Sequence, residues 1–423
     1  MRSKVKIILV LIVASAGLIS CGVAKNRAAS DSDTPVGPAI TGAEPRSPAT
    51  TAAADPSLPP LPVEETGKVE SLPSAYPESW ILVDESYFFN MYGGKVIIMD
   101  AAEKAHAKRI KGLVSKNLIG SMAQSKTRGE FYVMETFHER GSRGALTDVL
   151  VIYDKSTLAI RKEIIRSESK RLTALPQRYA MSLSNDEKFL YVFNFSPAAS
   201  VSVIDLETQE FVSEIGTPGC VLTYPASKRT IVSLCSNGGM LSTVIDDQGQ
   251  LVSQKRLPPF FDTDKTPIFE RPVIIDGIAY FTGFRGEVYE IDFRGEAAEY
   301  LSSWSMVTEE QKAENWRPSG LVLNDFDDKG LLYSIFQPQA HEGSQTQGGT
   351  QIWVFDVKAR ERVRVIDTPN WAISIAVTRG ENPLLIVTNG ELNLDVFNAQ
   401  NGEHVQTLAD FGNQTPLLVN KGY

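Results

Sequence analysis

Val96-Ile97-Ile98-Met99-Asp100 is an apolar run that ends in an acid, and its repetition along the chain predicts the fold. Six further copies of this pattern follow, the last with Asn in place of Asp, at residues 149–154, 201–205, 243–246, 288–292, 352–356 and 394–398. β-Branched and aromatic residues suit a half-buried strand, and a terminal Asp or Asn can accept a hydrogen bond from the backbone two residues on. Each copy therefore predicts the first arm of a β-hairpin.

The copies recur over a long range and end 41 to 64 residues apart. One hairpin plus about two more strands per period is typical of a β-propeller blade. A β-sandwich with similar strands needs no long-range period, so the repeat favours the propeller. The seven copies predict an all-β fold, a seven-bladed β-propeller. A strand left over after the seventh hairpin, Thr415–Val419, is predicted to complete the first blade and close the ring.

The N-terminus has the pattern of an export signal. Three basic residues precede an apolar run, Ile7–Ile19, which is too short to span a bilayer comfortably. The run ends at Cys21 and resembles a bacterial lipobox. We therefore expect a lipoprotein signal peptide over residues 1–20, lipid on Cys21, and a periplasmic protein anchored to the outer membrane, since Gly22 rather than Asp follows the Cys. The alternative is an ordinary secretory signal with an incidental Cys.

Composition separates the next segment from the rest of the chain. Residues 21–75 are rich in Ala, Pro, Ser, Thr and Asp, and no aromatic residue occurs between positions 22 and 75. Such a segment cannot bury enough apolar surface to offset its chain entropy, so a disordered tether is predicted. The propeller is predicted over residues 76–423. The formal net charge of −9 argues against a nucleic-acid partner.

Two cysteines remain besides Cys21, namely Cys220 and Cys235. They flank two apolar runs joined by a turn at 225–229, and the midpoint of the turn is also the midpoint of the pair. The two side chains are expected to face each other across an antiparallel hairpin, where the Cβ separation suits a disulfide. In an exported protein this predicts a disulfide, and the alternative is two free buried thiols.

The sequence offers no catalytic constellation. The four histidines form no HxH or HExxH pair, so no metal site is predicted. The chain also has no GxSxG, no P-loop and no dinucleotide fingerprint. Its five tryptophans are scattered and are predicted to pack in the core. No catalytic residue is therefore assigned to this chain.

Longer phrases resemble the heavy subunit of quinoprotein amine dehydrogenases, the methylamine and aromatic amine dehydrogenase family. These phrases are Arg178–Ala198 with Val201–Leu206, Thr217–Cys220 with Cys235, Thr308–Pro318, and Phe137–Asp148. The family carries a Cys pair at the spacing found here. The resemblance covers essentially all of residues 76–423, and it independently implies a seven-bladed propeller.

The resemblance implies a particular function. The family's heavy subunit is a periplasmic propeller that pairs with a small light subunit in a heterotetramer of two heavy and two light chains. The light subunit carries tryptophan tryptophylquinone, with which primary amines are oxidised to aldehyde and ammonia. Electrons then pass to a small copper protein or a cytochrome. The heavy chain is expected to bind no cofactor itself, but to shape the substrate channel and hold the light chain.

The matching motifs also supply candidate contacts to the light subunit or the channel, at one mouth of the propeller. These candidates are Phe137, Arg140, Arg143, Asp148, Phe195, Trp316 and Arg317. For each of them the alternative role is structural, because Arg and Asp can tie blades together and aromatic side chains can simply pack.

The chain departs from the family pattern at two places. Ser319-Gly320-Leu321 stands where the family has Gly-Gly-Trp, and Gly112-Leu113-Val114 is aligned with an aromatic gate near the family's channel. Altered channel residues are compatible with a different amine or with loss of catalysis. The alternative function is therefore a stand-alone β-propeller lipoprotein of the envelope, acting as a binding or scaffold module without catalysis.

Overall fold

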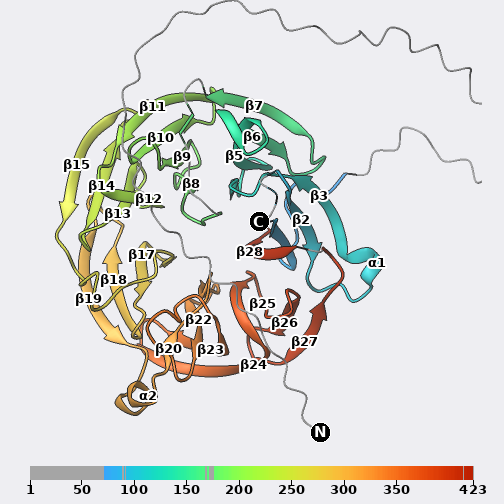
Figure 1. Ribbon diagram of the computed structural model, residues 1–423, viewed down its shortest axis with the longest axis vertical. Coiled ribbons are helices and arrows are strands. Elements are labelled where there is room, and N and C mark those ends of the chain that lie inside the picture. Colours follow the sequence, from blue (N-terminus) through green and yellow to red (C-terminus); the bar gives the residue numbers. More distant parts are fainter. Residues whose placement is uncertain are drawn as a thin grey trace, which may run out of the picture. The chain divides into compact units, whose positions relative to one another are not determined.

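All seven copies of the apolar-acid pattern form strands or strand ends in the structure, a computed structural model (Figure 1). The strands are β2 (Gly94–Asp100), β6 (Arg143–Asp154), β10 (Ser200–Asp205), β14 (Met240–Ile245), β18 (Glu287–Asp292), β23 (Gly349–Asp356) and β26 (Leu394–Asn398). At the end of each copy the Asp or Asn side chain accepts a hydrogen bond from the amide two residues on. The predicted hairpins and their turn chemistry are confirmed.

The structure describes residues 71–87, 90, 92–166, 169–170, 176–412 and 414–422. The predicted signal peptide, the lipidation site at Cys21 and the tether up to residue 70 lie outside these residues. Residues 68–423 form one compact unit. Near its start, the Leu72 amide donates to the Ser156 carbonyl at 2.7 Å. No helix within the described residues is long and apolar enough to cross a membrane.

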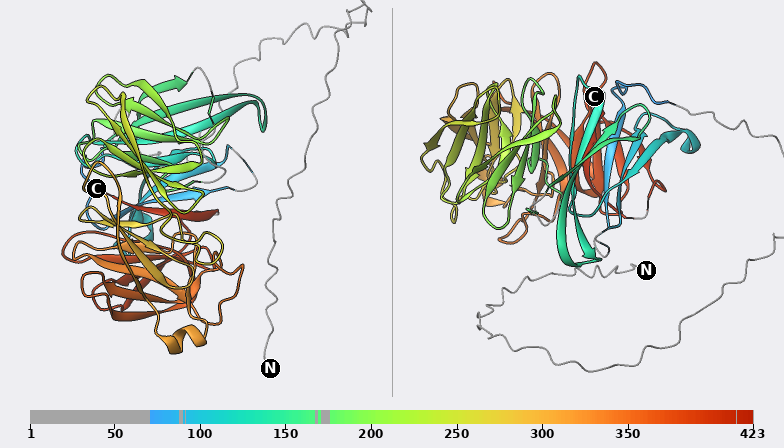
Figure 2. Two further views of the ribbon diagram at one scale, coloured as in Figure 1. Left: turned by 90° about the vertical axis from the view of Figure 1, so that its left-hand side faces the viewer. Right: turned by 90° about the horizontal axis from the view of Figure 1, so that it is seen from above.

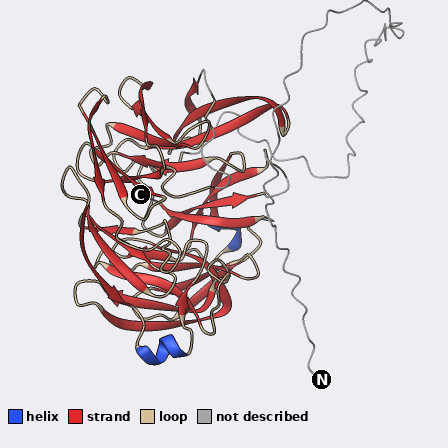
Figure 3. Cartoon of the chain, turned by 60° about the vertical axis from the view of Figure 1, so that its left-hand side comes forward, coloured by secondary structure: helices blue, strands red, loops and turns tan. Residues whose placement is uncertain are grey.

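Five four-stranded antiparallel sheets are arranged around a common axis (Figures 1 and 3). In order from the axis outward, the first contains β28 (Thr415–Lys421), β1 (Trp80–Ser86), β2 and β3 (Ile110–Ser115). The second contains β4 (Ser121–Gln124), β5 (Glu130–Arg140), β6 and β7 (Ile160–Arg166). The third contains β8 (Met181–Leu183), β9 (Phe189–Asn194), β10 and β11 (Glu210–Gly216). The fourth contains β12 (Cys220–Pro225), β13 (Thr230–Cys235), β14 and β15 (Leu251–Leu257). The fifth contains β16 (Val273–Ile275), β17 (Ile278–Thr282), β18 and β19 (Glu299–Ser305).

The remaining strands form a single eight-stranded sheet. Its members are β20 (Arg317–Pro318), β21 (Asn324–Phe326), β22 (Leu331–Gln337), β23, β24 (Glu361–Val377), β25 (Leu384–Asn389), β26 and β27 (His404–Leu408). Two short helices, α1 (His106–Arg109) and α2 (Glu309–Ala313), lie at the rim of the ring (Figure 1).

The prediction of seven separate blades is wrong, because the last two repeats share this large sheet. The long strand β24 pairs with β23 through its first half and with β25 through its second half. The backbones come very close where the two halves meet, since a Cβ on Gly348 would collide with the carbonyl of Ala372 in β24. Glycine therefore permits a continuous strand where the repeat count predicted a break. The propeller has five separate four-stranded blades and one eight-stranded sheet.

The C-terminal strand closes the ring, as the sequence predicted. Strand β28 pairs antiparallel with β1, and Val419 lies opposite Val83. The first sheet therefore combines strands from the two ends of the propeller, with β28 at the axis (Figure 1). This pairing removes an open sheet edge and links both ends of the propeller in one hydrogen-bonded unit.

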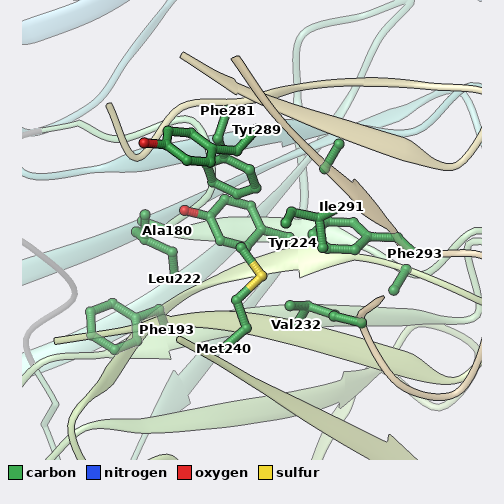
Figure 4. Close-up of a cluster of buried hydrophobic side chains, with 13 residues drawn as sticks. Ala180, Phe193, Leu222, Tyr224, Val232, Met240, Phe281, Tyr289, Ile291 and Phe293 are labelled. Carbon is green, nitrogen blue, oxygen red and sulfur yellow. The ribbon is translucent and has the colours of Figure 1, made fainter. Parts of the chain in front are cut away.

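Apolar side chains fill the space between neighbouring sheets. Between the fourth and fifth sheets, Tyr224 lies at the centre of a cluster with Phe281 and Phe293 (Figure 4). The rings of Tyr224 and Phe281 are perpendicular, with centroids 5.4 Å apart. At the end of the β12–β13 hairpin away from its turn, Cys220 and Cys235 are directly opposite and form the predicted disulfide.

Candidate functional site

One face of the propeller carries most of the residues that the sequence singled out. We call it the loop face, and define it by the connections from the second to the third strand of each sheet and from each sheet to the next. These connections contact one another around the ring. Phe260 donates from its amide to Gly238 at 3.0 Å, Phe284 donates to Pro267 at 2.9 Å, and the Tyr92 hydroxyl donates to the His138 carbonyl at 2.9 Å.

The seven predicted contact residues lie at this face in three separate sheets. Arg140, Arg143 and Phe195 are exposed, while Phe137, Trp316 and Arg317 are half-buried and Asp148 is buried. The structure therefore brings them to one face without joining them in a single cluster. Their separation suits a broad binding surface better than a compact catalytic centre.

The β5–β6 hairpin is the most prominent feature of the loop face. Its strands are 11 and 12 residues long, and the hairpin extends past the neighbouring strands (Figure 2). Asp148 holds its base, because one carboxylate oxygen accepts from the Thr136 hydroxyl at 2.7 Å and from the Ser169 hydroxyl at 3.0 Å. The other oxygen accepts from the Lys170 amide. Asp148 therefore positions the hairpin, and the exposed Arg140 and Arg143 at its tip are accessible to a partner.

A charged cluster surrounds Arg317, on a different part of the loop face. Glu342 accepts hydrogen bonds from Arg317 at 3.0 Å and from Arg285 at 3.1 Å, both at its Oε1 atom. The Arg317 guanidinium also lies over the ring of Phe284, 5.0 Å from its centroid. Arg317 is thus held in place by a carboxylate and an aromatic ring, while the Glu342 side chain remains 68% exposed.

A pocket of about 370 Å³ opens beside this cluster. Its apolar lining includes Phe269, Phe284 and Leu321, and its charged lining comprises Glu270, Arg271 and Glu342. Thr346 is the hydroxyl side chain of the lining, and within the described residues no hydrogen bond pairs it with Glu270 or Glu342, so no nucleophile is joined to a base here. The pocket is suited to receive an apolar or cationic group from outside the chain.

The floor of this pocket is tied to the core. The Tyr224 hydroxyl donates to the Glu270 carbonyl at 2.7 Å, and burial raises the pKa of Tyr224 far above its usual value. Gln177 accepts from Arg271 at 2.6 Å and donates to the Glu270 carboxylate at 2.9 Å. Burial lowers the pKa of Arg271 from its usual value, against the opposing effect of Glu270. These bonds fix the positions of both charged groups before any partner binds.

Trp316 and Phe195 have different surroundings. Trp316 packs on Trp353 with ring centroids 5.3 Å apart, and its indole nitrogen donates to Glu314 at 3.1 Å. Phe195, directly after β9, is 62% exposed. Trp316 therefore has the packing role that the sequence left as an alternative, whereas Phe195 is available for contact.

Sequence reasoning missed several residues of this site. Arg285 and Phe284 lie in a short turn and Glu342 lies in a different loop, so only the tertiary structure joins them to Arg317. The stretch aligned with the family's channel gate, Gly112–Val114, lies on β3. Leu113 lies on the outermost strand of the first sheet, where its side chain is 57% exposed and distant from the axis.

The chain is therefore a β-propeller with a projecting hairpin on its loop face. In the described lining of the pocket beside Arg317, no nucleophile is joined to a base. A family model described as methylamine dehydrogenase heavy chain (MADH) matches residues 83–420. The chain belongs to the methylamine dehydrogenase heavy chain family.

Individual relatives agree with this assignment. The methylamine dehydrogenase heavy chain of Methylobacillus flagellatus is 25% identical over 288 residues, covering 67% of this chain and 72% of that protein. The heavy chain of Paracoccus versutus is 24% identical over 314 residues, covering 74% of this chain and 73% of that protein.

Solved structures support the fold alone. The periplasmic gluconolactonase of Pseudomonas aeruginosa is similar with a TM-score of 0.53 and 14% identity, covering 81% of this chain and 99% of that one. At this identity the likeness shows a shared propeller architecture and carries no functional conclusion.

Proposed function

We propose that this chain is the large subunit of an amine dehydrogenase that oxidises primary amines to aldehyde and ammonia in the periplasm. The observation that carries the proposal is the family match over residues 83–420, nearly the whole described propeller. The chemistry would be supplied by tryptophan tryptophylquinone on a separate light subunit, which accepts the two electrons of amine oxidation. Membership of a heavy-chain family and the absence of a paired nucleophile and base in the described pocket lining both favour this division of labour.

The loop face is the surface that fits a light subunit. It offers an exposed aromatic anchor at Phe195, a projecting hairpin with Arg143, and the pre-positioned Arg317–Glu342 pair beside an apolar pocket. Aromatic and Arg side chains are the residues most often dominant in protein interfaces. Two heavy and two light chains would form the complex, with a small copper protein or cytochrome as electron acceptor.

The substrate channel would run between the light subunit and the pocket beside Arg317. In that position the carbon chain of the amine would meet the apolar wall formed by Phe269, Phe284 and Leu321. Export with a lipid anchor at Cys21 would place the complex in the periplasm at the outer membrane.

Affinity purification of the full chain from its native envelope fraction tests this proposal. We expect a small co-purifying chain that stains for quinone redox activity and has a visible chromophore. Purification of the chain alone, without a chromophore, would contradict the proposal and favour a stand-alone envelope binding module.

A further inference from the structure

A second pocket of about 370 Å³ lies around the propeller axis, separate from the site beside Arg317. The axial strands of several sheets line it, and β28 lies at the centre of the ring (Figure 1). Most of its polar lining comes from the carboxyl ends of these strands, including Gln124 at the end of β4 and Lys421 at the end of β28. Arg178 joins the lining from the other end of the axial strands, because it lies in the connection that leads into β8.

The lining is positively charged, although the protein is acidic. Four cationic residues line the pocket against two carboxylates, whereas the whole chain has a formal net charge of −9. The cationic residues are Lys126, Arg178, Arg379 and Lys421, and the carboxylates are Asp325 and Asp328. A hollow lined by one sign of charge concentrates ligands of the opposite sign.

The two carboxylates pair with Lys421 and Arg379, but neither accepts a hydrogen bond from Arg178. Asp325 is fully buried and uses both oxygens, accepting from Lys421 Nζ at 3.0 Å and from the Val377 amide at 2.7 Å. Arg178 lies 3.8 Å from the same carboxylate, which is too long for a hydrogen bond. Asp328 pairs with Arg379 at 3.2 Å.

Arg178 therefore has unused hydrogen-bonding capacity. Its side chain is only 20% exposed, and within the described part of the chain its guanidinium makes no hydrogen bond. A guanidinium has five donors in a planar fork that matches a carboxylate or a phosphate. The Arg178 nitrogens are not among the buried polar atoms without a partner, so water can reach them, and an anion would replace that water with two parallel charged hydrogen bonds.

One polar group of the lining lacks a hydrogen-bond donor. The side-chain nitrogen of Gln124 donates to the Lys421 carbonyl at 2.7 Å, which fixes the orientation of the amide. Its side-chain oxygen is buried and has no partner in the described structure. A ligand hydroxyl group could donate to this oxygen. Tyr179, Met181 and Phe326 supply apolar surface for the carbon part of such a ligand.

We propose that the axial pocket binds a small organic anion that also carries a hydroxyl group, with its carboxylate or phosphate on Arg178 and Lys421 and its hydroxyl on Gln124. This assignment rests on the positive charge of the lining, on Arg178 and on the unpartnered side-chain oxygen of Gln124. It is independent of the amine oxidation proposed above. The site is a binding site only, and no bond is made or broken in it.

Isothermal titration calorimetry of the full chain with lactate, propionate and glycerol 3-phosphate tests the proposal. Lactate or glycerol 3-phosphate is expected to bind, and the tighter of the two identifies the head group that the pocket prefers. Propionate lacks the hydroxyl group and should bind several-fold more weakly than lactate, as loss of one buried hydrogen bond predicts. Absence of binding by all three compounds would overturn the proposal.

Substitutions of lining residues test whether the anion binds in the axial pocket. Arg178→Met should weaken it at least tenfold, and Arg178→Lys should also weaken it because the planar fork is lost while the charge is kept. Asp328→Asn, at a side chain that is 54% exposed, should strengthen binding by removing a repelling charge. Arg294→Met is the matched control, since Arg294 lies on the same face but pairs only with Asp292 outside the pocket.

The outcomes remain decisive even if one variant folds poorly. Thermal unfolding of each variant shows whether it is folded, and Asp328→Asn tests the site through a gain rather than a loss. Equal affinity in Arg178→Met, Asp328→Asn and the unsubstituted protein would place the anion elsewhere and overturn the assignment.

Discussion

Asp325 and Lys421 form a buried ion pair at 3.0 Å that joins β21 of the eight-stranded sheet to the C-terminal strand β28. Burial alone would raise the pKa of Asp325, but the charges of Lys421, Arg178 and Arg379 together lower it to about 2. The pair is therefore both a link across the ring and part of the wall of the axial pocket.

Replacing Asp325 with Asn should destabilise the propeller by roughly 3 to 5 kcal/mol, because it leaves Lys421 buried without its counter-charge. Because the Asp325 pKa is lower in the folded than in the unfolded chain, its stabilising effect is present above about pH 4. That effect disappears as the pH falls towards 2. Urea unfolding at several pH values measures both effects, with Asp328→Asn as the exposed control. Equal stability of the two variants would contradict this role.

Anion binding in the axial pocket should weaken as the pH rises from 6 to 8. Burial lowers the pKa of Lys421 to about 7, so its ammonium group loses the proton within this range. Asp325, Arg178 and Arg379 face it from the neighbouring elements. Calorimetric titration with lactate at both pH values provides the measurement. A pH-independent affinity would show that Lys421 does not contact the anion.

Closure of the ring by β28 should be essential for stability. Val419→Asp buries a charge at a position that is 3% exposed and lies opposite Val83, and it should destabilise the protein by several kcal/mol. Val405→Asp is the control, because Val405 is 42% exposed on β27 and the change should cost less than about 0.5 kcal/mol. Thermal unfolding of both variants would reveal the difference. Similar melting temperatures would contradict a stabilising role for the pairing of β28 with β1.

The disulfide between Cys220 and Cys235 closes a loop with a sequence separation of 15 residues. Loop entropy predicts that its loss costs about 3 kcal/mol. Guanidinium unfolding of the Cys220→Ala, Cys235→Ala double variant should therefore have a lower midpoint, and a reductant should destabilise the unsubstituted protein but leave the variant unchanged. A reductant effect of equal size in both proteins would show that it does not act through this bond.

Phe195 should be an anchor for the light subunit. Phe195→Ala should weaken association by about 2 kcal/mol, or roughly 30-fold, with little change in folding because the ring is 62% exposed. Leu113→Ala is a matched control, since Leu113 is 57% exposed on the outer strand of the first sheet. Pull-down titration with the light subunit compares the two. An equal loss of affinity in both variants would contradict a light-subunit interface at Phe195.

Local sequence patterns predicted much of the fold. The seven hairpins, their Asp and Asn turns and the Cys220–Cys235 pair depend on residues close together in the chain, where side-chain type and spacing determine the backbone path. The closing strand was also predictable, because an unpaired strand at the C-terminus must find an open edge. Most of the loop-face residues were found only through family resemblance.

Strand period and turn chemistry predicted a closed, all-β propeller, because both are local and repeated, and the longer motifs that resemble amine dehydrogenase heavy chains predicted the family. Only the tertiary structure decided that β24 joins the last two repeats in one sheet, that Asp148 is buried, and that Glu342 meets Arg317 and Arg285. Asp325 and Lys421 are 96 residues apart and meet only at the axis. The physical reason is that contacts between different sheets form only when the ring closes, and no local pattern in the chain encodes which side chains then converge.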